Sequence, residues 1–325
     1  HFSYNSSNLD DFRSLAQNLL ILFRPNKGLK RDETMRSAKH SIIAPEPTEC
    51  SHKNDLHFSF AGGAILSFFN VGIAHWLIRN TDRAQLKKVY GVSGGALCAA
   101  WLLASKDSRS FGYITEQYLN EWKEYVQRLG GRLALQRSLA YHRSLLARYL
   151  PEDAHVSCSG RLSIVLLNIK TRKQEKVSHF KTRQDLIDYL IAAMTIPFVN
   201  TVIPSKINGQ RYVDGGIISN QVICCENVTL CSPFPNLFSP FKRQPIRPHQ
   251  TILGMNAITS AFNPYSDVHK QFELGYQTAK QFYESPADIR TTEYPNLVEE
   301  MQGLLEPVLP ALMQSTKESF SPQTH

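Results

Sequence analysis

The residues best suited to chemistry lie in one short stretch, Gly91-Val92-Ser93-Gly94-Gly95. It has the pattern G-x-S-x-G between a β-prone segment and a helix-prone one, the context of a nucleophile elbow. Glycines on both sides of Ser93 allow a tight turn that lifts the hydroxyl clear of its neighbours. The helix that follows directs free N–H groups toward any negative charge formed there. The alternative is a glycine-rich turn without chemistry, so other residues must support the elbow.

A second small-residue loop precedes the first along the chain. Residues 56–60 alternate as a strand does, and Ala61-Gly62-Gly63-Ala64 leads from them into a segment of helical spacing. Backbone N–H groups in such a loop can cradle an anion. Phosphate binding is one interpretation, although a Walker lysine and G-x-G-x-x-G are absent. The other is an oxyanion hole, formed by the amides of Gly62, Gly63 and Ala64 with that of Gly94, since successive β–α turns meet at one sheet edge.

A third candidate is Asp214, which is followed by Gly215 and Gly216. The Asn-Gly pair at 208–209 between β-prone flanks predicts a hairpin, with Asp214 at the end of its returning strand. Asp-Gly alone is an ordinary turn signal. The functional alternative is a carboxylate beside glycines that let another loop approach, with the Asn220 amide bracing that loop.

A serine nucleophile needs a base and donors for the oxyanion. One arrangement is a Ser–acid–His triad with His249 or His269 as the base, but Ser93 follows only one β–α unit, whereas the α/β-hydrolase elbow follows several strands. The other arrangement is a dyad in which Asp214 takes the proton from Ser93. A carboxylate with the usual pKa of about 4 is a weak base, so the oxyanion donors would supply much of the stabilisation.

These candidates require an α/β fold with a central, mostly parallel sheet. Strands are predicted near 161–169 and 175–180, and helices over 111–150, 185–194 and 265–283. The predicted organisation is an extension over 1–55 (an amphipathic helix and a linker), a domain over 56–284, and a tail over 285–325 that contains a candidate helix.

The composition is that of an ordinary globular protein: 325 residues, 42% hydrophobic and 20% charged. The net charge of +8 favours an anionic surface as partner, and scattered basic residues without a nucleic-acid motif favour a membrane over nucleic acid. Six cysteines lack CxxC or zinc spacing, which predicts free intracellular thiols and no metal site. No apolar run reaches the roughly 20 residues that span a bilayer.

Taken in order, the three motifs resemble those of the patatin-like phospholipase family, in particular its adipose triglyceride lipase-like branch. Flanking segments that strengthen the resemblance are residues 57–62, 149–155, 159–162, 196–198, 211–216 and 275–279. The resemblance covers about 56–284. It implies a three-layer α/β/α domain with a Ser–Asp dyad, which cleaves lipid acyl esters through an acyl-enzyme without a cofactor.

By position, the resemblance makes Ser93 the nucleophile, Asp214 the base and the Gly62–Ala64 loop the oxyanion hole. It implies a lipid ester substrate and a peripheral location on a membrane or lipid droplet. Two departures are Ala64 and Ser67, which stand where the family has glycines. They keep two alternatives open: acyl transfer to a glycerolipid or lysolipid acceptor, and a catalytically weak lipid-surface scaffold.

Overall fold

A computed structural model describes residues 55–222, 228–234, 246–248 and 261–284. The expected extension as far as residue 54, the expected tail and His249 lie outside these ranges. Within them, no helix is long and apolar enough to cross a membrane.

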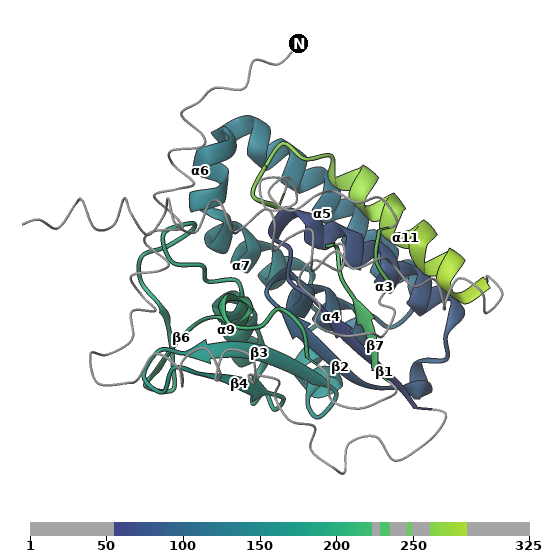
Figure 1. Cartoon of the computed structure of the whole chain (residues 1–325), viewed down its shortest axis with the longest axis horizontal. Helices are drawn as coiled ribbons and strands as arrows, with labels where there is room; N and C mark the ends of the chain where they lie inside the picture. The colour runs from purple at the N-terminus through teal and green to yellow at the C-terminus, as the bar shows by residue number, and fades with distance from the viewer. Residues whose placement is uncertain (1–54, 223–227, 235–245, 249–260, 285–325) are drawn as a thin grey trace, which may run out of the picture.

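The described strands form one mixed sheet of seven strands (Figure 1). Its four parallel members are β1 (Leu56–Phe60), β2 (Leu86–Val92), β3 (Leu162–Asn168) and β7 (Val228–Cys231). β4 (Lys173–Val177) and β6 (Gln210–Asp214) both run antiparallel to β3, and β5 (Ser205–Ile207) pairs with β6. The predicted α/β class is therefore confirmed, and both predicted hairpins form.

The hairpin between β5 and β6 shows why the local prediction succeeds. Asn208 and Gly209 have φ of 49° and 78°. A two-residue turn with both φ positive matches the twist of its flanking strands, and Asn-Gly is the pair that adopts it at least cost.

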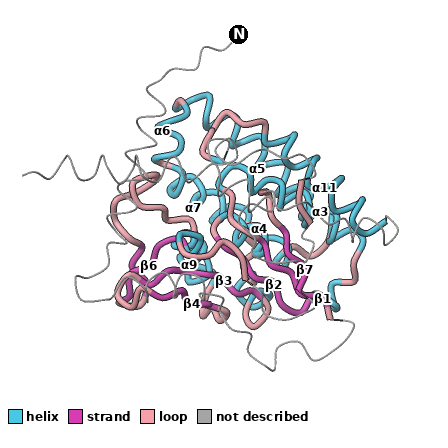
Figure 2. Tube along the Cα trace, in the orientation of Figure 1, coloured by secondary structure: helices cyan, strands magenta, loops and turns pink. Residues whose placement is uncertain are grey.

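Helices cover one face of the sheet in two tiers (Figure 2). α4 (Gly94–Ala104) and α9 (Arg183–Ala193) pack directly on the strands. Outside α4 lie α3 (Phe68–Asn80), α5 (Ser108–Leu129) and α11 (Val268–Glu284). The remaining described helices are α6 (Gly131–Gln136), α7 (Ser138–Tyr149), α8 (Ala154–Cys158), and the 3-10 turns η1 (Ala64–Ser67), η2 (Arg83–Gln85) and η3 (Gly215–Ile217).

The helical stretch expected over 111–150 is divided into α5, α6 and α7. The first division is at Gly130, whose φ of 78° ends α5. With a ψ of 150° it lies in a region that glycine enters freely and residues with a Cβ rarely adopt.

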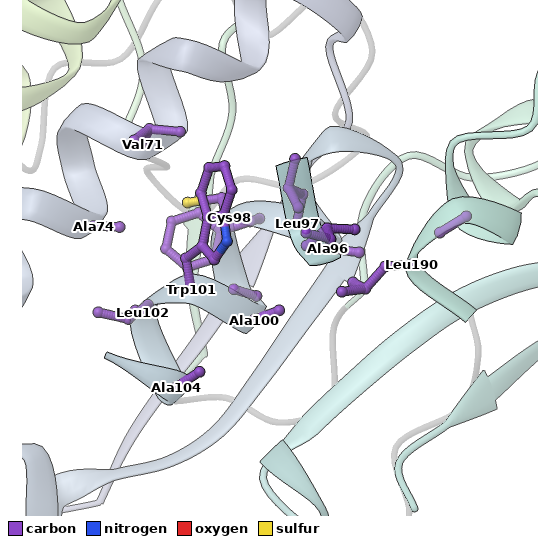
Figure 3. Packing of buried hydrophobic residues seen from close by; sticks show 14 of the residues in the cluster. Val71, Ala74, Ala96, Leu97, Cys98, Ala100, Trp101, Leu102, Ala104 and Leu190 are labelled. Atoms are coloured by element: carbon purple, nitrogen blue, oxygen red, sulfur yellow. The ribbon is translucent and has the colours of Figure 1, made fainter. Parts of the chain in front are cut away.

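The core is centred on α4. This helix is apolar on all sides, as expected for a helix buried between layers. Figure 3 shows Cys98 and Trp101 facing Val71 and Ala74 of α3, while Leu97 lies toward Leu190 of α9. A second, separate apolar cluster is formed by side chains of β2, β3 and β7 and of the segment that follows Asp214: Tyr90, Val92, Val165, Val222, Val228 and Leu230. The helix that follows Ser93, α4, therefore packs within the larger of these two apolar clusters.

Candidate active site

Ser93 lies between the end of β2 and the first residue of α4. Its φ of 54° and ψ of −132° are unfavourable for a side chain with a Cβ, and such strain is concentrated at functional sites. The glycines around it permit close packing: a Cβ on Gly91 would lie 2.3 Å from the Ala96 Cα, and one on Gly95 would lie 2.4 Å from the Phe60 carbonyl oxygen. The local structure is that of a nucleophile elbow.

The sheet brings Asp214 to Ser93 from 121 positions away along the chain. Consecutive residues of β3, Val165 and Leu166, pair with Val92 and Asp214 respectively. β4 pairs with both of these β3 residues along the opposite edge. β2 and β6 therefore share one edge of β3, end to end, and their final residues meet there.

The Asp214 carboxylate is a hydrogen-bond acceptor in this position. It accepts from the Ser93 hydroxyl and, at 2.8 Å, from the Gly216 N–H. Its own N–H donates to the Thr195 carbonyl at 2.9 Å, so the backbone of the residue is fixed as well. The structure thus joins the two polar side chains that the motifs singled out.

Burial changes the acidity of this carboxyl. Asp214 is 3% exposed, and desolvation raises its pKa to about 7 although the hydrogen bonds from Ser93 and Gly216 oppose the shift. The ordinary pKa of about 4 assumed from the sequence does not hold here. A carboxylate with a pKa near neutrality is a much better proton acceptor for a hydroxyl.

Asn220 fixes the first glycine loop against Ser93. The Gly62 N–H donates to Asn220 Oδ1 at 2.8 Å, and Asn220 Nδ2 donates to the Gly62 carbonyl at 3.0 Å. A Cβ on Gly62 would lie 2.6 Å from the Ser93 Cβ. Because its N–H is occupied, Gly62 does not meet the expectation of an oxyanion donor. It positions the loop, which leaves Gly63, Ala64 and Gly94 as candidates.

Ala64 adopts a left-handed backbone conformation, with φ of 47°. Such a conformation costs a residue with a Cβ about 1–2 kcal/mol, whereas glycine adopts it freely. Ser67 fills the space above the elbow helix, since its Oγ lies 2.4 Å from the place of a Cβ on Gly94. Both departures from the family pattern therefore lie directly at the nucleophile.

We expect Ala64→Gly to raise the free energy of unfolding by up to about 1 kcal/mol, because relief of strain exceeds the entropy that glycine gains on unfolding. The matched control is Ala147→Gly at an exposed position of α7, which should lose about 1 kcal/mol. Urea denaturation of both variants measures the difference. Equal losses would show that the backbone at Ala64 is unstrained.

A pocket opens beside Ser93, with an empty volume of about 690 Å³ that includes solvent at its mouth. Ser93 and Gly94 line it together with side chains that are mainly apolar, among them Phe68, Val71, Leu97, Met194, Ile196 and Val199. Apolar lining with few polar groups is typical of a site for an apolar ligand. This lining suits part of a hydrocarbon chain.

His142 also lines the pocket, and the sequence analysis did not single it out. Its Nδ1 donates to the Ser138 carbonyl at 2.6 Å, and Nε2 accepts from the Tyr118 hydroxyl at 2.7 Å. Burial lowers the His142 pKa to about 4, so the ring is neutral. The sequence signal that could have pointed to this part of the pocket was the helical spacing of Tyr118 and Trp122, which line the pocket together with His142.

The structure describes one of the two histidine alternatives. His269 is exposed on α11, and His249 lies outside the described residues. No group of three or more His, Cys, Asp or Glu within the described ranges is arranged to hold a metal ion. Cys98, Cys158 and Cys231 are buried free thiols.

Comparison with known proteins gives one family. The family model "Patatin-like phospholipase" matches residues 58–223, about half of the chain. Human "Patatin-like phospholipase domain-containing protein 2" is 33% identical over 182 residues, which cover 55% of this chain and 36% of that protein. Human "1-acylglycerol-3-phosphate O-acyltransferase PNPLA3" is 29% identical over 189 residues, covering 54% and 37%. This chain thus matches little more than a third of the length of either relative.

Among solved structures, VipD from Legionella pneumophila aligns with a TM-score of 0.43 and 13% identity, over 72% of this chain and 68% of that one. The resemblance stated from the motifs is confirmed by the family match, which contains Ser93, Asp214 and the Gly62–Ala64 loop. The chain belongs to the patatin-like phospholipase family.

Proposed function

We propose that this chain is a lipid acyl hydrolase that cleaves carboxylic esters through an acyl-enzyme on Ser93, with Asp214 as the base. The main support is the buried hydrogen bond from the Ser93 hydroxyl to a carboxyl whose pKa is about 7. The apolar pocket beside Ser93 supports an acyl chain as ligand, and the family supports a lipid substrate.

In the first half-reaction, Ser93 Oγ attacks the ester carbonyl carbon while Asp214 accepts the hydroxyl proton. The tetrahedral oxyanion accepts hydrogen bonds from the amides of Gly63, Ala64 and Gly94, the last at the positive end of the α4 dipole. Collapse breaks the carbon–oxygen bond of the ester, and the alcohol leaves with the proton from Asp214. In the second, water gives its proton to Asp214, attacks the acyl-enzyme and releases the fatty acid, and the proton returns to Ser93.

Acyl transfer is the second candidate function. It uses the same acyl-enzyme, with the hydroxyl of a glycerolipid or lysolipid in place of water. The name of the human relative that describes an acyltransferase favours keeping it. Product analysis with and without an added lysolipid acceptor separates the two, because only transfer yields a product that carries both groups.

The test is labelling of the full chain with a fluorophosphonate, together with hydrolysis of a panel of lipid esters. Labelling and turnover should be lost in Ser93→Ala. The matched control is Ser105→Ala, which removes a buried hydroxyl just beyond the other end of α4 and should leave both unchanged.

Labelling that persists in Ser93→Ala would overturn the assignment of the nucleophile. Turnover by the unmodified chain no higher than that of Ser93→Ala, on every ester tested, would favour the lipid-surface scaffold instead.

A further inference from the structure

The connection between α9 and β5 exposes apolar side chains to solvent. Phe198 is 47% exposed, Val202 is 72% exposed and Ile203 is 71% exposed. We refer to residues 198–203 as the rim loop; Figure 2 draws this connection as loop on the way from α9 to β6. Three large apolar side chains exposed within six residues are typical of an interaction surface.

The rim loop is held firmly with these side chains outward. Asn200 accepts from the Ile196 N–H at 2.9 Å through Oδ1, and its Nδ2 donates to the Met194 carbonyl at 2.8 Å. The Phe198 N–H donates to the Thr201 carbonyl at 2.8 Å. Phe198 has a φ of 67°, a costly conformation for an aromatic residue that its surroundings must maintain. These hydrogen bonds and this backbone conformation therefore hold the loop in the form that exposes its apolar side chains.

The same segment forms part of the pocket beside Ser93. Ile196, Val199 and Asn200 line that pocket, while Phe198, Val202 and Ile203 are exposed to solvent. Asn200 Nδ2 also reaches Ser138 Oγ at 3.4 Å, which ties the loop to the start of α7. One short segment thus contributes both to the lining of the pocket and to an apolar outer surface.

Positive charge borders this surface. Lys206 and Arg211 are exposed and face each other across the β5–β6 hairpin, and exposed Arg137 precedes Ser138. The chain from residue 194 to residue 213 contains no Asp or Glu. Apolar side chains flanked by cations are the pattern by which peripheral proteins bind anionic lipid surfaces.

We propose that the rim loop inserts Phe198, Val202 and Ile203 into the surface of an anionic phospholipid layer, and that this insertion seats the pocket on the layer. This rests on the proposed function, since it supplies the route of an acyl chain to Ser93. A chain that enters the pocket from the layer crosses no water, and Lys206 and Arg211 remain at the headgroups.

The experiment measures flotation of the full chain with vesicles of phosphatidylcholine alone and of phosphatidylcholine with phosphatidylserine in a four-to-one ratio. The double variant Val202→Glu/Ile203→Glu should bind the mixed vesicles at least tenfold more weakly. Hydrolysis of a soluble short-chain ester should stay within twofold of the unmodified chain, which shows that the fold and Ser93 are intact. Lys206→Gln/Arg211→Gln should lose most of the preference for the mixed vesicles.

The matched control is Val156→Glu. Val156 is 67% exposed on α8. This helix packs beside the later part of α4, where Cys158 Sγ donates to the Ala100 carbonyl, and not beside the start of α4 at Ser93. This control makes one of the two changes, valine to glutamate, at a valine of similar exposure and should bind vesicles as the unmodified chain does.

Unchanged vesicle binding by the double variant would overturn the proposal. A loss of soluble-ester hydrolysis as large as the loss of vesicle binding would also overturn it, because the loop would then act in catalysis. A third contrary result would be a dimer that dissociates in the double variant while vesicle binding stays unchanged. Ser93→Ala separates the two proposals: it should bind vesicles normally. If the unmodified chain binds through the rim loop but hydrolyses no ester, docking stands and the proposed function fails.

Discussion

Replacing Asp214 by asparagine is expected to reduce the rate of ester hydrolysis by about 10³-fold or more. This lies in the upper part of the range expected when a general base is lost. The amide retains an oxygen that can accept from the Gly216 N–H, but it cannot take the proton of Ser93. The measurement is kcat/KM for a soluble ester at pH 8. In the unmodified chain, kcat/KM should rise with pH through about 7, because only the ionised Asp214 is a base.

The same substitution is expected to stabilise the fold at alkaline pH. The folded-state pKa of Asp214 is about 7 and its ordinary value in an unfolded chain is 3.8, so between these values the folded state holds a proton that the unfolded state has released. The free energy of unfolding therefore falls as pH rises through this window, and the full cost of the buried charge is present above pH 7. Asparagine carries no charge and avoids this cost, which is on the order of 4 kcal/mol for a shift of this size.

Urea denaturation at pH 8 and at pH 4 checks this result. Asp214→Asn should be more stable than the unmodified chain at pH 8, and the difference should shrink toward pH 4. The control is Asp188→Asn, which removes a partly exposed carboxylate paired with Arg143 and should give no gain that grows with pH. An Asp214→Asn variant that is active, or less stable at pH 8 than at pH 4 relative to the unmodified chain, would contradict the assignment.

The second large effect concerns stability alone and lies at the crossing of α3 and α11 (Figure 1). A Cβ on Gly275 would lie 1.9 Å from the Phe69 carbonyl oxygen, and one on Gly72 would lie 2.0 Å from the Phe272 carbonyl oxygen. Both contacts are with backbone, which cannot rotate away. Gly275→Ala should therefore lower the free energy of unfolding by about 3 kcal/mol, at the upper end of the usual cost of overpacking.

The matched control for this prediction is Gly112→Ala in α5. A Cβ there would meet only the His75 ring, at 3.7 Å, which is an ordinary contact. Alanine should then stabilise by up to about 1 kcal/mol through its higher helix propensity. Thermal or urea denaturation should give opposite signs for the two variants. Equal effects would mean that α11 does not pack closely on α3.

Several features could be predicted from the sequence because their causes are local. The elbow follows from a glycine on each side of Ser93 between a β-prone and a helix-prone segment. The β5–β6 hairpin follows from Asn208 and Gly209, and α11 from apolar residues at helical spacing. The residues left a dyad with Asp214 and a triad with a histidine as alternatives, and the resemblance, confirmed by the family match over residues 58–223, favoured the dyad.

Other features depend on segments that are distant along the chain. The role of Gly62 could not be predicted, because the partner of its N–H is Asn220, 158 residues away. The pocket lining from α5, α7 and the rim loop could not be predicted either, since these segments meet only after packing. For the same reason the partial burial and the neutral state of His142 could not be predicted.

The sequence by itself thus determined which residues form the elbow, the glycine loop and the Asp-Gly turn, since turn chemistry and periodicity act over a few residues. Only the tertiary structure decided that β2 and β6 end against neighbouring residues of β3, which brings Ser93 and Asp214 together. It also decided that Asp214 has a pKa of about 7 and that Ala64 is left-handed. Strand partners, desolvation and imposed backbone strain are properties of the packed chain.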